Sequence, residues 1–181
     1  PAVISISSHV ARGTVGNRAT VFALESLGYP VWSVPTVTLP WHPGHGPSTR
    51  IVPDGESFAS FASDLARSPW LGEVGAVISG YFGAPEQVGA VAALVDAVKA
   101  RNPQALYLCD PVLGDGGANG TGRLYQPAAL LEAIRDELIP RADIAVPNRF
   151  ELEFLMGLEF SGNDHLVEAA SALGPRAVVV T

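Results

Sequence analysis

Short apolar runs alternate along this chain with longer segments whose apolar residues are spaced as on one face of a helix. The expected strands are Val3–Ile6, Val31–Val37, Ala76–Ser79, Leu106–Cys109, Ile144–Val146 and Ala177–Thr181. The expected helices are Asn17–Leu27, Asp54–Arg67, Pro85–Arg101, Pro127–Leu138, a helix that opens at Asn148, and His165–Leu173. This alternation predicts an α/β fold with a mainly parallel central sheet and helices on both faces.

The sequence stops at its last expected strand. In an α/β sheet a strand is normally followed by a loop and a helix, and no such unit follows Thr181. We therefore expect a single α/β domain over residues 1–181 that is incomplete at its C-terminus, as if truncated after Thr181.

Composition excludes several classes of protein. Hydrophobic residues make up 48% of the chain and charged residues 16%, which favours a large core over disorder. The formal net charge of −7 argues against nucleic acid or an anionic membrane as partner. The single cysteine, Cys109, lies in an apolar run, which fits a reducing, cytoplasmic compartment. No apolar run approaches the ~20 residues of a membrane span, and Ala2–Ile6 lacks the basic segment that opens a signal peptide.

Two of the expected strands end in acidic or amide side chains. The fourth leads into Asp110 and Asp115, and the fifth leads into Asn148 and Glu151. The carboxyl ends of parallel strands share one edge of the sheet, where ligands bind in open α/β folds. Carboxylates at that edge suit Mg²⁺ held against phosphates. The alternatives are that Asp110 belongs only to a turn and that Glu151 only completes a capping box with Asn148.

Polar residues follow the first and third expected strands as well. The segment Ser7–Asn17 is expected either as a substrate loop, with the Ser8 hydroxyl available to donate or accept, or as a capping turn. Its two glycines do not form a Gly-x-Gly-x-x-Gly pattern, so no dinucleotide fingerprint is indicated. Gly80 and Tyr81 begin a turn where the ring could line a site for a planar ligand, or simply pack.

Two further loops are candidates for covering a ligand. Thr38–Pro47 contains His42 and His45 and is expected to cover a ligand or to be a plain surface loop. A zinc site there is disfavoured because the one cysteine lies in another strand. Gly114–Gly122 has five glycines in nine residues and is expected to be a mobile flap or lid.

Taken together, these motifs resemble the pyridoxal kinase family of the ribokinase-like superfamily, and the resemblance covers nearly the whole chain. The motifs that carry it are Ser8-His9-Val10 with Gly13 and Gly16-Asn17, Ser79-Gly80-Tyr81 with Gly83, Cys109-Asp110-Pro111-Val112 with Gly114, and Pro147-Asn148 with Glu151-Leu152.

The resemblance implies ATP-dependent phosphorylation of the 5′-hydroxymethyl group of pyridoxal, pyridoxamine or pyridoxine, in vitamin B6 salvage. It implies substrate contacts by Ser8, His42, Gly80 and Tyr81, and lid residues Asp115 and Tyr125. It implies ATP contacts by Asp110, Val146, Asn148, Glu151 and Thr181. It also implies Mg²⁺ at Asp110 and, through water, at Glu151, and a homodimer.

Two departures from the family pattern affect these expectations. Many members have a threonine where this chain has Pro43, so one substrate hydrogen bond is lost or supplied differently. The superfamily places its catalytic base in a Gly-x-Gly-Asp motif, which does not occur in these 181 residues. We therefore assign no catalytic residue in this chain and expect negligible kinase activity from the 181 residues alone. A hydroxymethylpyrimidine kinase-like enzyme and a non-catalytic fragment that binds ligand are the alternatives.

Overall fold

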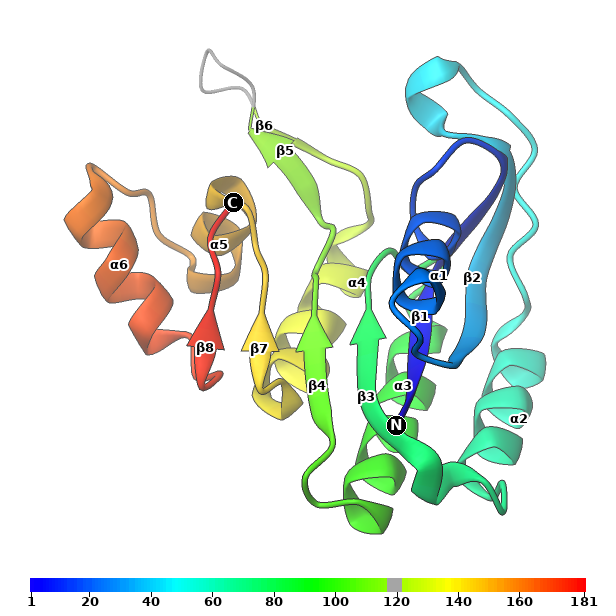
Figure 1. Cartoon of the computed structure of the whole chain (residues 1–181). Helices are drawn as coiled ribbons and strands as arrows, with labels where there is room; N and C mark the ends of the chain where they lie inside the picture. Colours follow the sequence, from blue (N-terminus) through cyan, green and yellow to red (C-terminus); the bar gives the residue numbers. More distant parts are fainter. Residues whose placement is uncertain (117–121) are drawn as a thin grey trace.

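The structure is a computed structural model of the chain and describes residues 1–116 and 122–181. Its centre is a six-stranded sheet in the order β2-β1-β3-β4-β7-β8, with every neighbouring pair parallel (Figure 1). The strands of this sheet are β1 (Ala2–Arg12), β2 (Val31–Trp41), β3 (Val74–Ser79), β4 (Leu106–Cys109), β7 (Ile144–Ala145) and β8 (Ala177–Val178).

Helices cover both faces of the sheet, as predicted. They are α1 (Asn17–Ser26), α2 (Gly55–Ala66), α3 (Glu86–Arg101), α4 (Ala128–Ala133), α5 (Arg149–Met156) and α6 (Asn163–Ala172). The alternation of side chains along β1 shows the two faces: Ile4 and Ile6 belong to the core that α3 covers, whereas Ser5 between them bonds to Asn17 of α1. No helix in the described ranges is long and apolar enough to cross a membrane.

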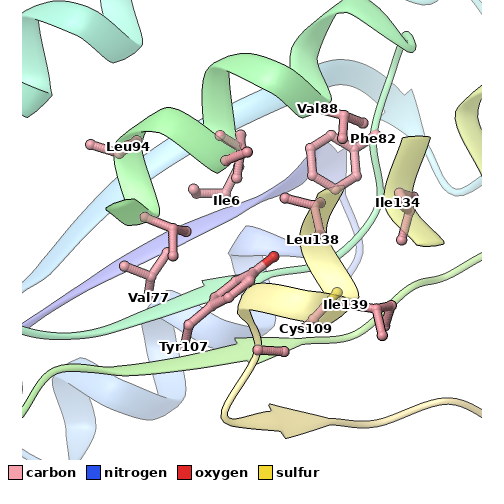
Figure 2. Close-up of a cluster of buried hydrophobic side chains, with 14 of the residues drawn as sticks. Ile6, Val77, Phe82, Val88, Leu94, Tyr107, Cys109, Ile134, Leu138 and Ile139 are labelled. Carbon is pink, nitrogen blue, oxygen red and sulfur yellow. The ribbon is translucent and has the colours of Figure 1, made fainter. Parts of the chain in front are cut away.

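The main core lies between the sheet and the layer of α2, α3 and α4. Figure 2 shows part of it, with Ile6, Val77 and Tyr107 of the sheet facing Val88 and Leu94 of α3. The buried hydroxyl of Tyr107 is paired with the Ser79 hydroxyl at 2.7 Å, so its burial leaves no polar atom unsatisfied. A smaller core around Leu152, Phe160 and Ala169 joins α5 to α6.

Several predicted boundaries are confirmed because they depend on local chemistry. Strand β4 has the predicted limits. Asp54 caps α2, with its Oδ1 accepting from the Ser57 N–H at 2.8 Å, and Asn148 forms the predicted capping box with Glu151 at the start of α5.

The expected boundaries of the first two strands are wrong. The segments expected as loops after them continue as strand, so β1 runs to Arg12 and β2 to Trp41. They pair beyond the expected ends, with His9 opposite Thr38 and Arg12 opposite Trp41. In the added parts, β1 and β2 provide hydrogen-bond partners for each other's backbone groups. This pairing explains why polar residues remain extended there.

Other expected elements are shorter or divided. Only Ala177–Val178 of the last expected strand is strand, and the helix expected over 127–138 is α4 followed by a π-helical segment, Ile134–Leu138. The expected flap begins and ends in a small antiparallel hairpin of β5 (Gly114–Gly116) and β6 (Gly122–Leu124). Residues 117–121 of that flap lie outside the described residues.

Candidate active site

A cavity of about 910 Å³ lies at the carboxyl ends of β1, β3 and β4. Most of the site residues predicted from the sequence line it, and they come from seven separate places in the chain. The predicted residues that line it are Ser8, His42, Gly80, Tyr81, Asp110, Asp115, Tyr125 and Val146. The predicted edge of the sheet is therefore the place where these side chains meet.

Three predicted residues are not part of the cavity wall. Asn148 and Glu151 lie behind it, where they bond to the backbone of the hairpin. Thr181 is exposed, and its N–H donates to the Pro147 carbonyl at 3.2 Å. The structure thus brings Asn148 and Glu151 next to the site and leaves Thr181 beside β7.

The wall that contains Ser8 is held by Gly16 and Asn17. Gly16 has φ +56°, and a Cβ added to it would lie 2.3 Å from the Ser8 carbonyl oxygen and 2.5 Å from the Ser8 hydroxyl. Only glycine fits this approach without a shift of the backbone. The buried Asn17 amide donates to the carbonyls of Ser7 at 3.2 Å and Val34 at 3.1 Å, and so ties α1 to both β1 and β2.

The turn after β3 is fixed by backbone and side-chain bonds. The Gly80 N–H donates to the Ile6 carbonyl at 2.8 Å, and the Tyr81 N–H donates to the Ser7 hydroxyl at 3.2 Å. The Thr36 hydroxyl donates to the Tyr81 carbonyl at 2.6 Å. These bonds position the Tyr81 ring at the cavity, where it can contact a planar ligand.

Asp110 is a partly buried acidic residue of the cavity wall. Burial, with a smaller effect of the nearby Glu151 charge, raises the pKa of Asp110 to about 6. Among residues 1–116 and 122–181 no cation lies within ion-pair distance of its carboxylate. A partly buried carboxylate without a cationic partner suits a divalent cation, which would lower that pKa again.

Glu151 is buried and its two oxygens are already used. Its Oε1 accepts from the Leu113 N–H at 2.7 Å, and its Oε2 accepts from the Asn148 N–H at 2.8 Å. Burial raises the pKa of Glu151, and these backbone donors oppose that effect. Glu151 therefore fixes the start of the hairpin, which fits an indirect contact to a metal better than a direct one.

The hairpin is anchored by Asp115 and Asn148. The Tyr125 hydroxyl donates to Asp115, and the Asn148 amide donates to Asp115 at 3.3 Å and to the Gly114 carbonyl at 2.8 Å. Between Asp110 and the hairpin, Val112 has φ +44°, a region that β-branched residues rarely occupy. Of the two predicted lid residues, Asp115 is thus bonded to Asn148, the N-cap of α5, and Tyr125 is bonded to Asp115.

Several residues of this region were not predicted from the sequence. Arg50 and Arg123 line the cavity, and the buried Gln87 bonds to Gly83 and Thr36 at the Tyr81 turn. Arg50 is the only basic residue between Arg18 and Arg67 apart from histidines, which is a weak signal. Nothing in the sequence distinguishes Gln87 from a surface residue of α3.

Comparisons with known proteins identify the relatives of this chain. A family model described as phosphomethylpyrimidine kinase matches residues 73–181. Pyridoxal kinase PdxY of Granulibacter bethesdensis is 40% identical over 186 residues, which cover 99% of this chain and 64% of that protein. Pyridoxal kinase of Ovis aries is 36% identical over 182 residues, which cover 99% of this chain and 58% of that protein.

Solved structures agree with these relatives. Pyridoxal kinase from Leishmania donovani in complex with ADP and pyridoxamine has a TM-score of 0.87 and 34% identity, covering 97% of this chain and 62% of that one. A phosphomethylpyrimidine kinase from Bacteroides thetaiotaomicron with pyridoxal, described as putative, has a TM-score of 0.83 and 27% identity, covering 99% and 62%. The chain thus spans less than two thirds of the length of these relatives.

Proposed function

Because this chain belongs to the pyridoxal kinase family of the ribokinase-like superfamily, we propose that its protein transfers the γ-phosphoryl group of ATP to the 5′-hydroxymethyl group of pyridoxal or a related vitamer. The main support for this proposal is that Ser8, Tyr81 and Asp110 line the same cavity. A relative of this fold binds ADP and pyridoxamine, which supports both substrates.

In this proposal the chain acts by positioning its substrates. Ser8 offers a hydroxyl to the pyridine ring, and His42, Gly80 and Tyr81 border the ring. Bound Mg²⁺ would supply positive charge that neutralises the transferring phosphates, and Asp110 would hold it, with Glu151 acting through water.

The remaining predicted residues have secondary roles. Val146, Asn148 and Thr181 would contact the nucleotide, and Asp115 and Tyr125 would close over the phosphates and exclude water. No Gly-x-Gly-Asp occurs in the 181 residues, so we assign the proton acceptor to none of them. We also propose that the protein is a homodimer, which the family resemblance supports. A cytoplasmic location is supported by the buried single thiol of Cys109.

A hydroxymethylpyrimidine is the second candidate substrate, favoured by the description of the matching family model. Calorimetric titration without ATP compares the two ligands and does not depend on a catalytic base. We expect pyridoxal to bind more tightly than the hydroxymethylpyrimidine.

We also expect Ser8→Ala to weaken pyridoxal binding about tenfold, the effect of one lost hydrogen bond. The exposed Ser60→Ala in α2 is the matched control and should bind normally. Tighter binding of the pyrimidine, or no binding of pyridoxal, would contradict the proposed function.

A further inference from the structure

Arg50 is a cationic side chain at the cavity that the proposed reaction has not used. Its position is set by the backbone, because its neighbour Ile51 forms a two-way bridge with Thr38 of β2, with N–H to carbonyl distances of 2.9 and 3.0 Å. From there the guanidinium reaches across to the turn after β3. Its Nη1 donates to the Tyr81 hydroxyl oxygen at 3.1 Å, and its Cζ lies 5.8 Å from the centre of the Tyr81 ring.

The charge of Arg50 is not paired with a carboxylate in the described part of the chain. Within residues 1–116 and 122–181, no carboxylate lies within 4.0 Å of its guanidinium, although the chain carries a net charge of −7. Its Nη2 donates to a neutral group, the Gly83 carbonyl, at 3.5 Å. An arginine has five N–H donors in a fixed fork, so donors remain for a ligand.

The neighbours of Arg50 also present donors to the cavity. A guanidinium can only donate, so the Tyr81 oxygen is the acceptor of their bond and its own proton is free to point elsewhere. The His42 Nδ1 accepts from the Gly44 N–H at 3.1 Å, which leaves the proton of the neutral ring on Nε2. Arg50, Tyr81 and His42 all line the cavity, so its wall carries donors from all three.

The donors around Arg50 lie in the part of the cavity assigned to the ring of the substrate. The Arg50 guanidinium is bonded to Tyr81, and the proposed function places Tyr81 and His42 beside that ring. Asp110, which the proposed function assigns to the metal and the phosphates, follows β4.

We propose that Arg50 is a specificity-determining residue that, with Tyr81, selects a substrate whose ring carries an ionised hydroxyl, namely a 3-hydroxypyridine bound as its phenolate. This inference rests on the proposed function and deepens it. A cation and two neutral donors stabilise an oxyanion more than a neutral hydroxyl, so the bound ring hydroxyl should ionise at a lower pH than the free one. A ring that lacks the hydroxyl would leave these donors without an acceptor.

The test measures binding without ATP. Pyridoxine and 3-deoxypyridoxine are titrated by calorimetry into wild type, Arg50→Gln and Arg50→Lys, and the ionisation of bound pyridoxine is followed by its ultraviolet absorbance against pH. We expect wild type to prefer pyridoxine at least tenfold. We expect Arg50→Gln to bind pyridoxine at least tenfold more weakly and to bind the 3-deoxy ligand almost as well as wild type does. In this variant the pH at which the hydroxyl of bound pyridoxine ionises should move back toward that of free pyridoxine.

Arg50→Lys keeps the charge without the fork, so part of the preference should remain. Arg67→Gln, on the exposed end of α2 away from the cavity, is the control and should match wild type. If Arg50→Gln lost affinity equally for both ligands, Arg50 would only hold the Tyr81 turn, and the proposal would be overturned. Unchanged affinity for both ligands would overturn it as well. Failure of wild type to bind either ligand would overturn the proposed function as well.

Discussion

The carboxylate of Asp110 should lower the stability of the protein when neither metal nor nucleotide is bound. Its pKa of about 6 lies roughly 2 above the ordinary value of 3.8, because burial and Glu151 disfavour the charged form. Each pH unit of that difference corresponds to about 1.4 kcal/mol, which gives an upper limit of about 3 kcal/mol. Water in the cavity screens part of this, so we expect Asp110→Asn to stabilise the protein by about 1–3 kcal/mol at pH 7.5.

The sign of the pH dependence follows from proton binding. The folded state holds the Asp110 proton up to about pH 6, whereas the unfolded state releases it near pH 4. The wild type therefore loses stability relative to Asp110→Asn as the pH rises from about 4 to about 6. Below pH 4 the carboxyl is protonated in both states, and the two proteins should be equally stable.

Urea unfolding at pH 4, 6 and 7.5, in buffer with a chelator, measures this difference. Asp64→Asn is the control, because Asp64 forms an exposed pair with Arg67 that contributes at most about 1 kcal/mol. Adding Mg²⁺ with ATP should stabilise wild type and not Asp110→Asn. A variant no more stable than wild type at pH 7.5, or a difference that persists unchanged at pH 4, would refute this account of Asp110.

Three other substitutions test how the site is held. Asn17→Ala removes the buried amide that donates to the Ser7 and Val34 carbonyls and should cost about 1–3 kcal/mol in urea unfolding. A neutral result would contradict the role of Asn17. Gly16→Ala forces a Cβ against Ser8 and should weaken pyridoxal binding at least tenfold by calorimetry. Wild-type affinity would show that the backbone around Gly16 can shift without disturbing Ser8. Glu151→Gln replaces one acceptor by an amide group that cannot accept from the Leu113 or Asn148 N–H, and should lower thermal stability by about 1–3 kcal/mol; an unchanged melting temperature would contradict it.

The sequence predicted best where the chemistry is local. Asp54 and the pair Asn148–Glu151 cap helices through side chains three residues apart, and such spacing is visible in the sequence. Asp110 was placed correctly at the carboxyl edge because an apolar run leads directly into it. These features need no knowledge of distant parts of the chain.

The sequence predicted poorly where partners are distant. The extension of β1 past Ser7 depends on β2, whose Thr38 and Trp41 are its partners, and neither strand reveals the other. Arg50 acquires its role only when β2 and the turn after β3 bring it to Tyr81, 31 residues away. The expected flap stays a prediction over residues 117–121.

The most direct test of the proposed function is phosphoryl transfer by the protein expressed from its complete reading frame. Pyridoxal, Mg²⁺ and ATP are supplied, and formation of pyridoxal 5′-phosphate is followed by its absorbance, with Asp110→Asn as the comparison. We expect turnover on pyridoxal that exceeds turnover on the hydroxymethylpyrimidine and falls at least a hundredfold in Asp110→Asn. Absence of pyridoxal 5′-phosphate, or equal turnover by the variant, would contradict the proposal that this cavity is a vitamin B6 kinase site.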